Sequence, residues 1–396
     1  MSNIPKLRFP EFNGEWEEKR FGDILSLNMV PVPKPDTEYE RLGIFCHNKG
    51  TFHEHITDPS YIALDTLYKV HKNNFIVNIT FAWEHAIAIT TQNDEDALVT
   101  FRFLMFSFNK GYYHQFFKYA FSKEKFRYDL NVASPGGAGR NRVLNQKQLN
   151  NINLIVPSIS EQEKIADFLS NVDSIITAET KILKKLQKKK KALMQQLFTQ
   201  QLRFKSNDGT DFPAWEERKL GDVCSYIGGG TPSKKVKEYW NGNINWASVK
   251  DITGKYLYET QDKISQLGAD SSATNICEPD SLLLITRMSP GKTVITKCIT
   301  AINQDLKIVN SDINVEFLHL LFQSIQTKID EKTSGTTVKG ISIEGLNQID
   351  IRLPCKAEQQ KITACLSSLD SLIQTQQKVV TTWQQRKKAL LQQMFI

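Results

Sequence analysis

Two stretches of this chain carry apolar residues at alternating four- and three-residue steps, which is the spacing of a helix with one buried stripe. They are residues 155–198 and 352–395, and they align without a gap at a constant offset of 197 residues. Roughly two aligned positions in five are identical, more than a shared heptad composition produces, so the chain contains an internal duplication. The predicted stripe residues are Ile165, Leu169, Val172, Ile176, Leu183, Leu186, Leu193 and Leu197 in the first stretch, and Ile362, Leu366, Leu369, Ile373, Val380, Trp383, Leu390 and Met394 in the second.

The pattern predicts two long helices that pack along this stripe. A rod of about 38 residues at roughly 1.5 Å per residue is about 57 Å long. A rod with one apolar stripe cannot bury that stripe alone, and its own repeat is the partner at the highest effective concentration. We therefore expect the rods to pair within the chain. If they pair antiparallel, the segments that precede them lie at opposite ends of a fixed spacer.

Two positions of the stripe are polar in both copies, Glu179 with Gln376 and Lys190 with Lys387. Polar residues in an apolar seam lower stability and fix register, so one interpretation is that these four residues align the two helices. The alternative is that the helices diverge at these positions and leave the side chains in water.

The duplication extends beyond the rods. The run WEEKRFGDI at 16–24 recurs as WEERKLGDV at 215–223. Before each rod, LNNINLIVP at 149–157 matches LNQIDIRLP at 346–354, and each is an apolar, strand-like run that ends at a proline. These shared segments form a repeated frame around two inserts.

The inserts themselves, residues 25–148 and 224–345, have similar lengths but show no convincing alignment. A repeated frame that holds two unlike inserts is expected if each insert recognises something different. In the first insert we expect strands within 74–80, 86–90 and 98–108 and a helix at 112–121. The phenylalanines at 101, 103, 106 and 108 are expected to fill a core.

The sequence therefore predicts an α+β chain of four parts. Residues 1–154 and 201–351 form two globular domains of mixed β-sheet and helices, and residues 155–200 and 352–396 form two long helices that separate them. We expect these helices to make an antiparallel coiled coil, with pseudo-two-fold symmetry between the two halves.

Composition sets only loose bounds on function. The chain has 396 residues, 40% of them apolar, and a net charge of +7, which permits nucleic-acid binding without requiring it. Its six cysteines show neither a CxxC pair nor zinc-type spacing, which favours a reduced, cytoplasmic setting. Neither an export signal nor a membrane anchor is expected, because the apolar runs are short.

The first insert offers one candidate ligand-binding loop. Residues 134–142, SPGGAGRNR, combine Gly136 and Gly137 with Arg140 and Arg142. Backbone N–H groups and arginine forks in such a loop suit phosphates or guanine edges. The alternative is an ordinary glycine-rich turn.

The second insert has more candidates. Glycines, hydroxyls and lysines in the run 227–235, IGGGTPSKK, suit contact with a phosphate backbone, and further basic or flexible positions follow it. Each signal is weak by itself. The candidates are Gly229, Gly230, Thr231, Ser233, Lys234, Lys235, Trp246, Lys250, Arg287, Lys292 and Lys339.

No motif for catalysis or metal binding is complete. The run SPGKT at 289–293 ends like a phosphate-binding P-loop, but Thr286 stands where the first glycine is required. The run HEH at 53–55 begins like a zinc-protease motif, but Thr57 replaces its second histidine. We therefore expect a non-enzymatic protein without catalytic, cofactor-binding or metal-binding residues.

The signatures EQEKI at 161–165 and EQQKI at 358–362, each followed by a KKAL run, resemble the specificity subunits of type I restriction-modification enzymes. The run GGGTPSKKVKEYWNG at 228–242 is similar to one version of that family's target recognition domain. The resemblance covers essentially the whole chain. It implies that each insert reads one half of a split, asymmetric target in double-stranded DNA, with the helices setting the unread spacer.

The resemblance also implies partners. The family's subunit binds two copies of an adenine-methylating modification subunit and, through them, restriction subunits that carry the motor and nuclease. It implies that S-adenosylmethionine, ATP and Mg are used by those partners and that this chain binds no cofactor itself. The competing hypothesis is a coiled-coil scaffold whose domains bind proteins and have no DNA specificity.

Overall fold

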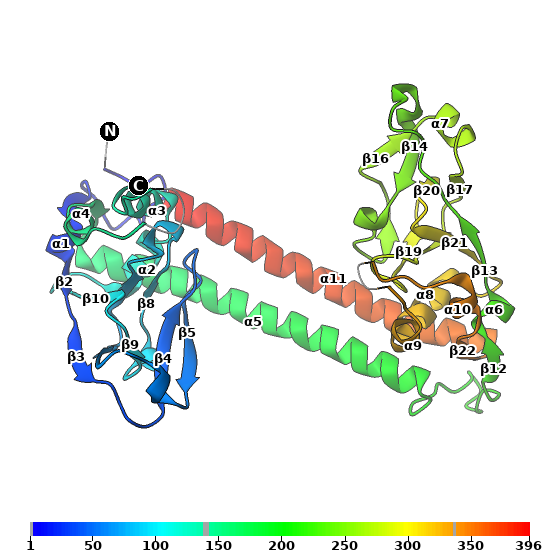
Figure 1. Ribbon diagram of the computed structural model, residues 1–396, viewed down its shortest axis with the longest axis horizontal. Helices are drawn as coiled ribbons and strands as arrows, with labels where there is room; N and C mark the ends of the chain where they lie inside the picture. Colours follow the sequence, from blue (N-terminus) through cyan, green and yellow to red (C-terminus); the bar gives the residue numbers. More distant parts are fainter. Residues whose placement is uncertain (1–2, 138–141, 336–337) are drawn as a thin grey trace. The chain divides into compact units, whose positions relative to one another are not determined.

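The computed structural model describes residues 3–137, 142–335 and 338–396 (Figure 1). Its contacts divide the chain into two compact units, one of residues 1–181 with 378–396 and the other of residues 182–377. Each of the two long helices contributes one half to each unit. Helices and strands are mixed in both units, which confirms the predicted α+β class.

The long helices are α5 (Ile159–Phe198) and α11 (Lys356–Gln393). At about 1.5 Å per residue each is close to 60 Å long. Every predicted stripe residue on both helices is buried or half-buried, and most positions on their outer faces are exposed. The apolar periodicity therefore predicted both the extent of the helices and the face that packs.

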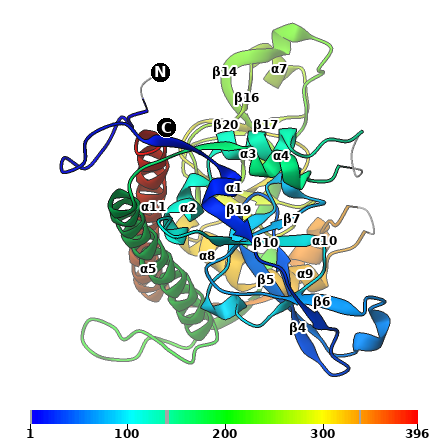
Figure 2. The same ribbon diagram turned by 90° about the vertical axis from the view of Figure 1, so that its left-hand side faces the viewer.

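In the first unit the two helices run in opposite directions. The start of α5 and the end of α11 share one core, in which Ile165 and Leu169 cluster with Met394 and Phe395. Further along α5, Asp173 meets Lys387, which lies earlier in α11. Figure 2 shows α5 and α11 side by side in this unit, viewed toward their ends.

The second unit shows the same antiparallel order. Leu197, at the end of α5, shares a core with Leu366 and Leu369 near the start of α11. Earlier in α5, Lys190 meets Asp370, which lies later in α11.

The repeated frame forms the same small motif in each unit. In the first, β1 (Glu17–Arg20) pairs antiparallel with β11 (Asn153–Val156), and α1 (Phe21–Ile24) follows β1. In the second, β12 (Glu216–Lys219) pairs with β22 (Asp350–Leu353), and α6 (Leu220–Val223) follows β12. The strand-like runs predicted at 149–157 and 346–354 are therefore shorter strands. The first two residues of each predicted run are instead the last two residues of a short helix, α4 (Gln146–Asn150) in the first unit and α10 (Ile343–Asn347) in the second.

The first insert forms two sheets. One has the order β2 (Leu25–Leu27), β10 (Phe103–Phe108), β7 (Phe75–Asn78) and β8 (Ile87–Ile89), and all its neighbours pair antiparallel. The other has the order β3 (Val30–Pro33), β6 (Thr66–Lys69), β9 (Leu98–Val99), β4 (Tyr39–Ile44) and β5 (Thr51–Ile56). The α-helices of this insert are α2 (His114–Ala120) and α3 (Glu124–Val132). Single 3₁₀ turns are η1 (Pro59–Tyr61), η2 (Ala82–Glu84) and η3 (Gln92–Asp94).

A phenylalanine-rich core joins this insert to its frame. Phe106 is buried with Phe21 of α1 and Phe75 of β7, as the core prediction required. The predicted run at 98–108 is interrupted by a turn at 100–102, where Phe101 is 50% exposed. The core prediction is therefore wrong for Phe101, because this residue lies in the turn and half of its surface stays exposed to solvent.

The second insert also forms two sheets. The first has the order β13 (Ser225–Gly228), β21 (Leu306–Asn310), β18 (Leu282–Ile285), β19 (Thr293–Thr296) and β15 (Tyr256–Leu257). The second has the order β16 (Asp262–Ile264), β14 (Trp240–Ala247), β20 (Thr300–Ile302) and β17 (Asn275–Cys277). Its α-helices are α7 (Gln266–Asp270), α8 (Val315–Ser324) and α9 (Gln326–Glu331). Its 3₁₀ turns are η4 (Lys237–Tyr239) and η5 (Val249–Asp251).

Helix α8 connects the second insert to its frame and helices. Phe317 and Leu321 of α8 are buried in the core that also holds Leu197 of α5 and Leu366 of α11. Among the helices that the structure describes, none is both long enough and apolar enough for a membrane span.

Candidate nucleic-acid interface

A buried glutamate at the start of each long helix holds the frame in place. In the first unit Glu161, 1% exposed, accepts hydrogen bonds from Arg8 Nη2 at 2.7 Å and from Trp16 Nε1 at 3.3 Å. In the second unit the repeat places Glu358, Arg203 and Trp215 in the same arrangement, with distances of 2.7 and 3.0 Å. A buried carboxylate is tolerated because its oxygens are paired with donors. The repeated EQ signature thereby explains how each frame is fixed to its helix.

The next residue of the signature closes the loop before each helix. Gln162 Nε2 donates to the carbonyl oxygen of Pro157, and Gln359 Nε2 donates to that of Pro354, both at 2.9 Å. Gln162 also accepts from the backbone N–H of Tyr113, which ties the helix to the loop before α2.

Two lysine–aspartate pairs join the long helices. Lys190 Nζ lies 2.6 Å from Asp370 Oδ1, and Lys387 Nζ lies 2.5 Å from Asp173 Oδ1. The exposed fractions of these side chains lie between 18% and 27%. Both polar seam lysines therefore pair across the helices, which favours the register interpretation over the solvated one.

Each aspartate also contacts an insert. In the first unit Asp173 accepts from Tyr119 Oη at 2.9 Å and lies 3.6 Å from Lys118 Nζ, both on α2. In the second unit Asp370 Oδ2 lies 3.7 Å from Lys255 Nζ, just before β15. Each insert is thus held on the helix pair through charged side chains.

Four of the predicted residues of the second insert line one open hollow of about 460 Å³. They are Thr231, Lys234, Trp246 and Lys250. Ser248, Asp262, Asn303 and Gln304 complete the lining. Lys250 Nζ pairs with Asp262 Oδ2 at 2.7 Å. The amides, the hydroxyls and the Lys234 ammonium suit base edges and phosphates, and the Asp262 carboxylate can accept from a base amino group.

The glycines and Trp246 shape this hollow. A Cβ on Gly229 would lie 2.3 Å from the carbonyl oxygen of Ile302, and one on Gly230 would lie 2.7 Å from the carbonyl carbon of Ala273. Trp246 is only 5% exposed, and its Nε1 donates to the carbonyl oxygen of Gly230 at 3.1 Å. The two glycines allow close backbone packing, and Trp246 positions the loop that carries the exposed Ser233, Lys234 and Lys235.

A turn at 303–305 connects this hollow to the remaining candidates. Thr231 Oγ1 donates to Gln304 Oε1 at 2.6 Å, and the adjacent Asp305 lies 3.3 Å from Arg287 Nη1. Arg287 also bridges to Gly340 in the loop of Lys339. Arg287 and Lys339 therefore extend the same polar region.

Lys292 is exposed at the end of the turn that follows β18. Its carbonyl oxygen accepts from the backbone N–H of Ile285 at 2.8 Å, which closes this turn.

In the first insert, the predicted loop at 134–142 offers fewer side chains that could bind a ligand. Arg142 is half-buried, and its guanidinium donates to the carbonyl oxygens of Asn131 and Ser134 at 2.6 and 2.9 Å. It also lies over the Trp83 ring. Arg142 therefore holds its own loop together. Gly136 and Gly137 precede it in the loop, and Arg140 lies outside the described residues.

Asn303, Gln304 and Asp262 were missed by sequence reasoning. They lie on a turn after β20 and on β16, far from the run 227–235 in sequence. A polar turn NQD between two apolar strands was the only signal available, and such turns are common on protein surfaces.

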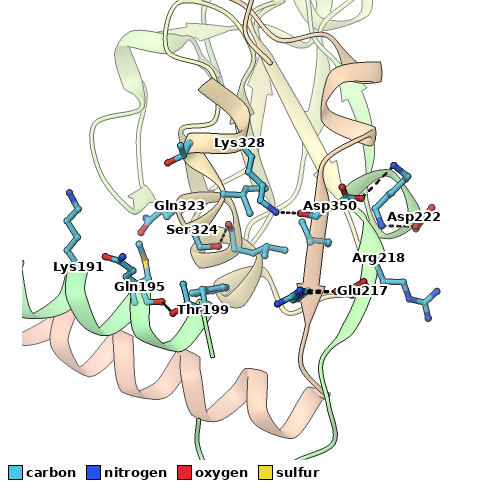
Figure 3. Close-up of a pocket in the computed structure, with 18 residues that line it drawn as sticks. Lys191, Gln195, Thr199, Glu217, Arg218, Asp222, Gln323, Ser324, Lys328 and Asp350 are labelled. Atoms are coloured by element: carbon cyan, nitrogen blue, oxygen red, sulfur yellow. Dashed lines mark hydrogen bonds and ion pairs between the residues drawn. The ribbon is translucent and has the colours of Figure 1, made fainter. Parts of the chain in front are cut away.

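A larger hollow of about 960 Å³ lies in the second unit between the end of α5, the β12–β22 sheet and α9 (Figure 3). Its charged residues largely pair with one another. Arg352 lies 3.0 Å from Glu217, and Lys328 Nζ donates to the carbonyl oxygen of Asp350 at 2.6 Å. This hollow is formed mostly by the repeated frame and the end of α5.

The described residues contain no group of three or more histidine, cysteine or acidic side chains placed to hold a metal ion. The cysteines are free, and burial raises the pKa of Cys224 and of Cys277 to about 11, which keeps them as unreactive thiols. Burial lowers the pKa of His319 to about 4, and this ring bonds to Thr293 and Gln323. Thr293 and His319 are both buried, so their contact lies within the core of the second unit.

Fold and site together define a class of duplicated proteins, in which two unlike domains are mounted on a shared pair of long helices. The chain belongs to the family described as the type I restriction modification DNA specificity domain, whose model matches residues 13–188 and 214–382. The two matches cover both inserts and most of both long helices.

Curated relatives agree with this family. The chain is 30% identical over 189 residues to the type I restriction enzyme MjaIX specificity subunit of Methanocaldococcus jannaschii, covering 46% of this chain and 44% of that protein. It is also 30% identical over 166 residues to the EcoR124I/EcoR124II specificity subunit of Escherichia coli, covering 40% and 41%. The matched segments thus span less than half the length of these relatives.

Solved structures share the fold. A chain from a study of complex assembly and conformational transition of the type I R-M system matches with a TM-score of 0.60 at 18% identity, covering 96% of this chain and 97% of that one. The type I restriction-modification S subunit from M. genitalium also matches with a TM-score of 0.60, at 14% identity and 99% coverage of both chains.

Proposed function

We propose that this chain is the DNA-recognition subunit of a type I restriction-modification enzyme. Its first insert reads one half of an asymmetric bipartite target in double-stranded DNA, and its second insert reads the other half. Phosphate contacts supply affinity that depends strongly on salt, whereas contacts to base edges select the sequence. The long helices set the unread spacer between the half-targets.

One observation carries this proposal: a repeated frame holds two inserts that do not resemble each other in sequence. The frame repeats its buried Glu161 and Glu358 contacts, whereas the inserts that it holds differ in sequence and in strand order. In the second insert, the hollow containing Thr231, Lys234, Lys250 and Gln304 presents donors and acceptors suited to bases and phosphates.

The chain also docks modification subunits that methylate adenine in the DNA target and, through them, restriction subunits. An apolar groove of about 410 Å³ on the helix pair of the first unit supports such docking. Phe168, Ile175, Trp383 and Leu390 are among its lining residues. Ile175 is 36% exposed and Phe168 is 37% exposed, so a partner helix would bury them.

The chain performs no chemistry itself. S-adenosylmethionine, ATP and Mg are bound by its partners, and the target adenine is turned out of the DNA stack by the modification subunit. The side chains that line the described hollows supply binding groups rather than an activated nucleophile or a metal site.

Mapping of methylated adenines across the genome tests this function. Cells that carry the chain and its modification subunits should methylate a two-part motif, and deletion of this chain alone should remove that methylation. If methylation of every motif persisted without the chain, the DNA-recognition function would be wrong and a protein scaffold would be favoured.

A further inference from the structure

The two units differ at one equivalent place, where each insert meets the helix pair. The offset of 197 residues relates the side chains that the helices contribute there: Ser170, Asp173 and Lys387 in the first unit, and Ser367, Asp370 and Lys190 in the second. The groups that the inserts add to this shared setting are different.

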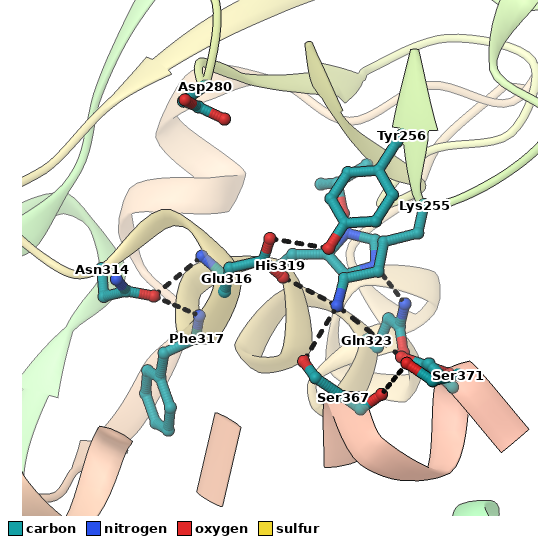
Figure 4. Close-up of polar contacts among 12 residues, drawn as sticks. Lys255, Tyr256, Asp280, Asn314, Glu316, Phe317, His319, Gln323, Ser367 and Ser371 are labelled. Atoms are coloured by element: carbon teal, nitrogen blue, oxygen red, sulfur yellow. Dashed lines mark hydrogen bonds and ion pairs between the residues drawn. The ribbon is translucent and has the colours of Figure 1, made fainter. Parts of the chain in front are cut away.

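In the second unit the place is filled and its charges balance. Lys255 Nζ lies 2.7 Å from Glu316 Oε2 and donates to Ser367 Oγ at 3.2 Å, as Figure 4 shows. Tyr256 Oη donates to the other oxygen of Glu316 at 2.8 Å. Two ammonium groups, those of Lys190 and Lys255, face the carboxylates of Glu316 and Asp370, and Lys255 is only 11% exposed.

In the first unit the same place is a hollow of about 740 Å³. Ser170 and Lys387 line it from the helices, and Lys49 and Lys118 line it from the insert. No carboxylate is among the described residues that line it. Asp173, which is not among the lining residues, contacts Lys387 and Lys118 and balances only one of the three ammonium charges.

The polar rim of this hollow is held in a fixed conformation. Asn48 and Asn73 both line it and both have left-handed backbones, with φ of 52° and 61°. Their backbone N–H groups donate at 2.9 Å to the carbonyl oxygens of His85 and Thr90. Non-glycine residues adopt this conformation at a cost, so the surrounding contacts hold the two amides where they lie.

Ammonium, amide and hydroxyl groups without a carboxylate are the set that binds phosphate. We infer that this hollow of the first unit takes a backbone phosphate of the DNA target, with Lys49 and Lys118 as its ammonium contacts. The inference rests on the proposed function and adds a contact site to it. It also makes the recognition asymmetric, because Lys255 and Glu316 fill the equivalent place in the second unit.

The test measures binding of the full-length chain to a duplex that carries its mapped target, over a range of salt concentrations. Each lost phosphate contact lowers the slope of log K against log salt by about 0.9. The double variant Lys49→Gln with Lys118→Gln should therefore lower the slope by roughly 2. Lys118 is 58% exposed, and Asp173 keeps Lys387 and Tyr119 as partners, so the fold should survive.

Two controls make this result specific. Lys110→Gln with Lys125→Gln removes the same charge from exposed positions of the same unit outside the hollow and should leave the slope unchanged. Lys49→Arg with Lys118→Arg keeps the charge and should retain the wild-type slope. If the Lys49→Gln, Lys118→Gln variant and the Lys110→Gln, Lys125→Gln variant gave equal slopes of log K against log salt, the phosphate site would be wrong. Wild-type binding to the target would still support the proposed function.

Free phosphate has the same chemistry as a DNA phosphate, and a second arm separates the two. Inorganic phosphate is added at constant ionic strength, and thermal unfolding of the wild type and of the Lys49→Gln, Lys118→Gln variant is compared. Suppose that phosphate raised the unfolding temperature of the wild type only, and that the double glutamine variant kept the wild-type salt slope for DNA binding. This result would assign the hollow to a free anion and overturn the DNA contact. If the wild type bound no specific duplex at all, the proposed function itself would fail.

Discussion

At the scale of single residues, one buried carboxylate fixes each copy of the frame. Glu161 joins Arg8 and Trp16, which lie about 150 residues earlier in the chain, to the first turn of α5. The arginine–carboxylate contact is two-pronged, because Arg8 Nε also donates to Glu161 at 2.8 Å. Such paired geometry confers orientation as well as stability.

Removal of this carboxylate should destabilise the first unit. Glu161→Ala removes the acceptor of the Trp16 N–H and of Arg8 Nε, and it leaves Arg8 only the carbonyl oxygens of Asn13 and Gly14 as partners. Because Arg8 is 13% exposed, water can replace only part of the loss. We expect a cost of about 2–4 kcal/mol in the free energy of unfolding, measured by chemical denaturation. Glu163→Ala, at an exposed position of the same helical turn, should change stability by less than about 0.5 kcal/mol. Equal effects of the two variants would contradict this role.

His319 gives the second unit a dependence on pH. Burial, reinforced by the nearby Lys255, lowers the pKa of this ring to about 4, whereas an unfolded histidine titrates near 6.5. As pH falls through 6.5 the unfolded chain takes up a proton that the folded chain refuses until about pH 4, so stability is lost across this window. The loss from pH 7 to 4 is about 3 kcal/mol.

Denaturation of the His319→Gln variant between pH 7 and pH 4 measures this contribution. The variant should lose the histidine's part of the pH dependence, whatever its stability at pH 7. His47→Gln, at an exposed position, should keep the wild-type dependence. An unchanged pH slope in His319→Gln would show that other groups cause the acid sensitivity.

At the scale of elements, the two long helices are aligned by charge as well as by apolar packing. Lys190 with Asp370 and Lys387 with Asp173 connect α5 to α11 at partly buried positions. An apolar stripe alone permits slippage by a heptad, whereas a partly buried ion pair is satisfied only in one register.

A double-mutant cycle on Lys190 and Asp370 should measure this contribution. We expect a coupling energy of about 1 kcal/mol or more from Lys190→Ala, Asp370→Asn and their combination, because these side chains are 18% and 19% exposed. The matched cycle on Lys125 and Asp129, an i,i+4 pair on the surface of α3 whose side chains are 63% and 21% exposed, should give about 0.3–0.5 kcal/mol. A coupling energy no larger than that of the surface pair would mean that packing alone sets the register.

The sequence predicted elements better than it predicted sites. The stripe of α5 and α11 could be read directly, because the 3.6-residue period determines which side chains a helix buries. The contact between Thr231 and Gln304 could not, because it joins residues 73 positions apart through strand pairing that no local pattern specifies. For the same reason Arg142 looked available for a ligand, although its guanidinium binds the backbone at Asn131 and Ser134.

At the scale of the whole molecule, the proposed function requires two independent inserts on a repeated frame to read two halves of one DNA target. The frame contacts of Glu161 and Glu358 are equivalent, whereas the two inserts form sheets of different strand order. A frame conserved within one chain lets either insert be exchanged without disturbing the other. Specificity should therefore be modular.

The most direct measurement is to exchange residues 25–148 for the corresponding insert of another family member and then map methylated adenines in cells that express the hybrid. We expect one half of the methylated motif to change, while the other half and the spacer length stay the same. A motif in which both halves change, or neither does, would contradict the proposed function.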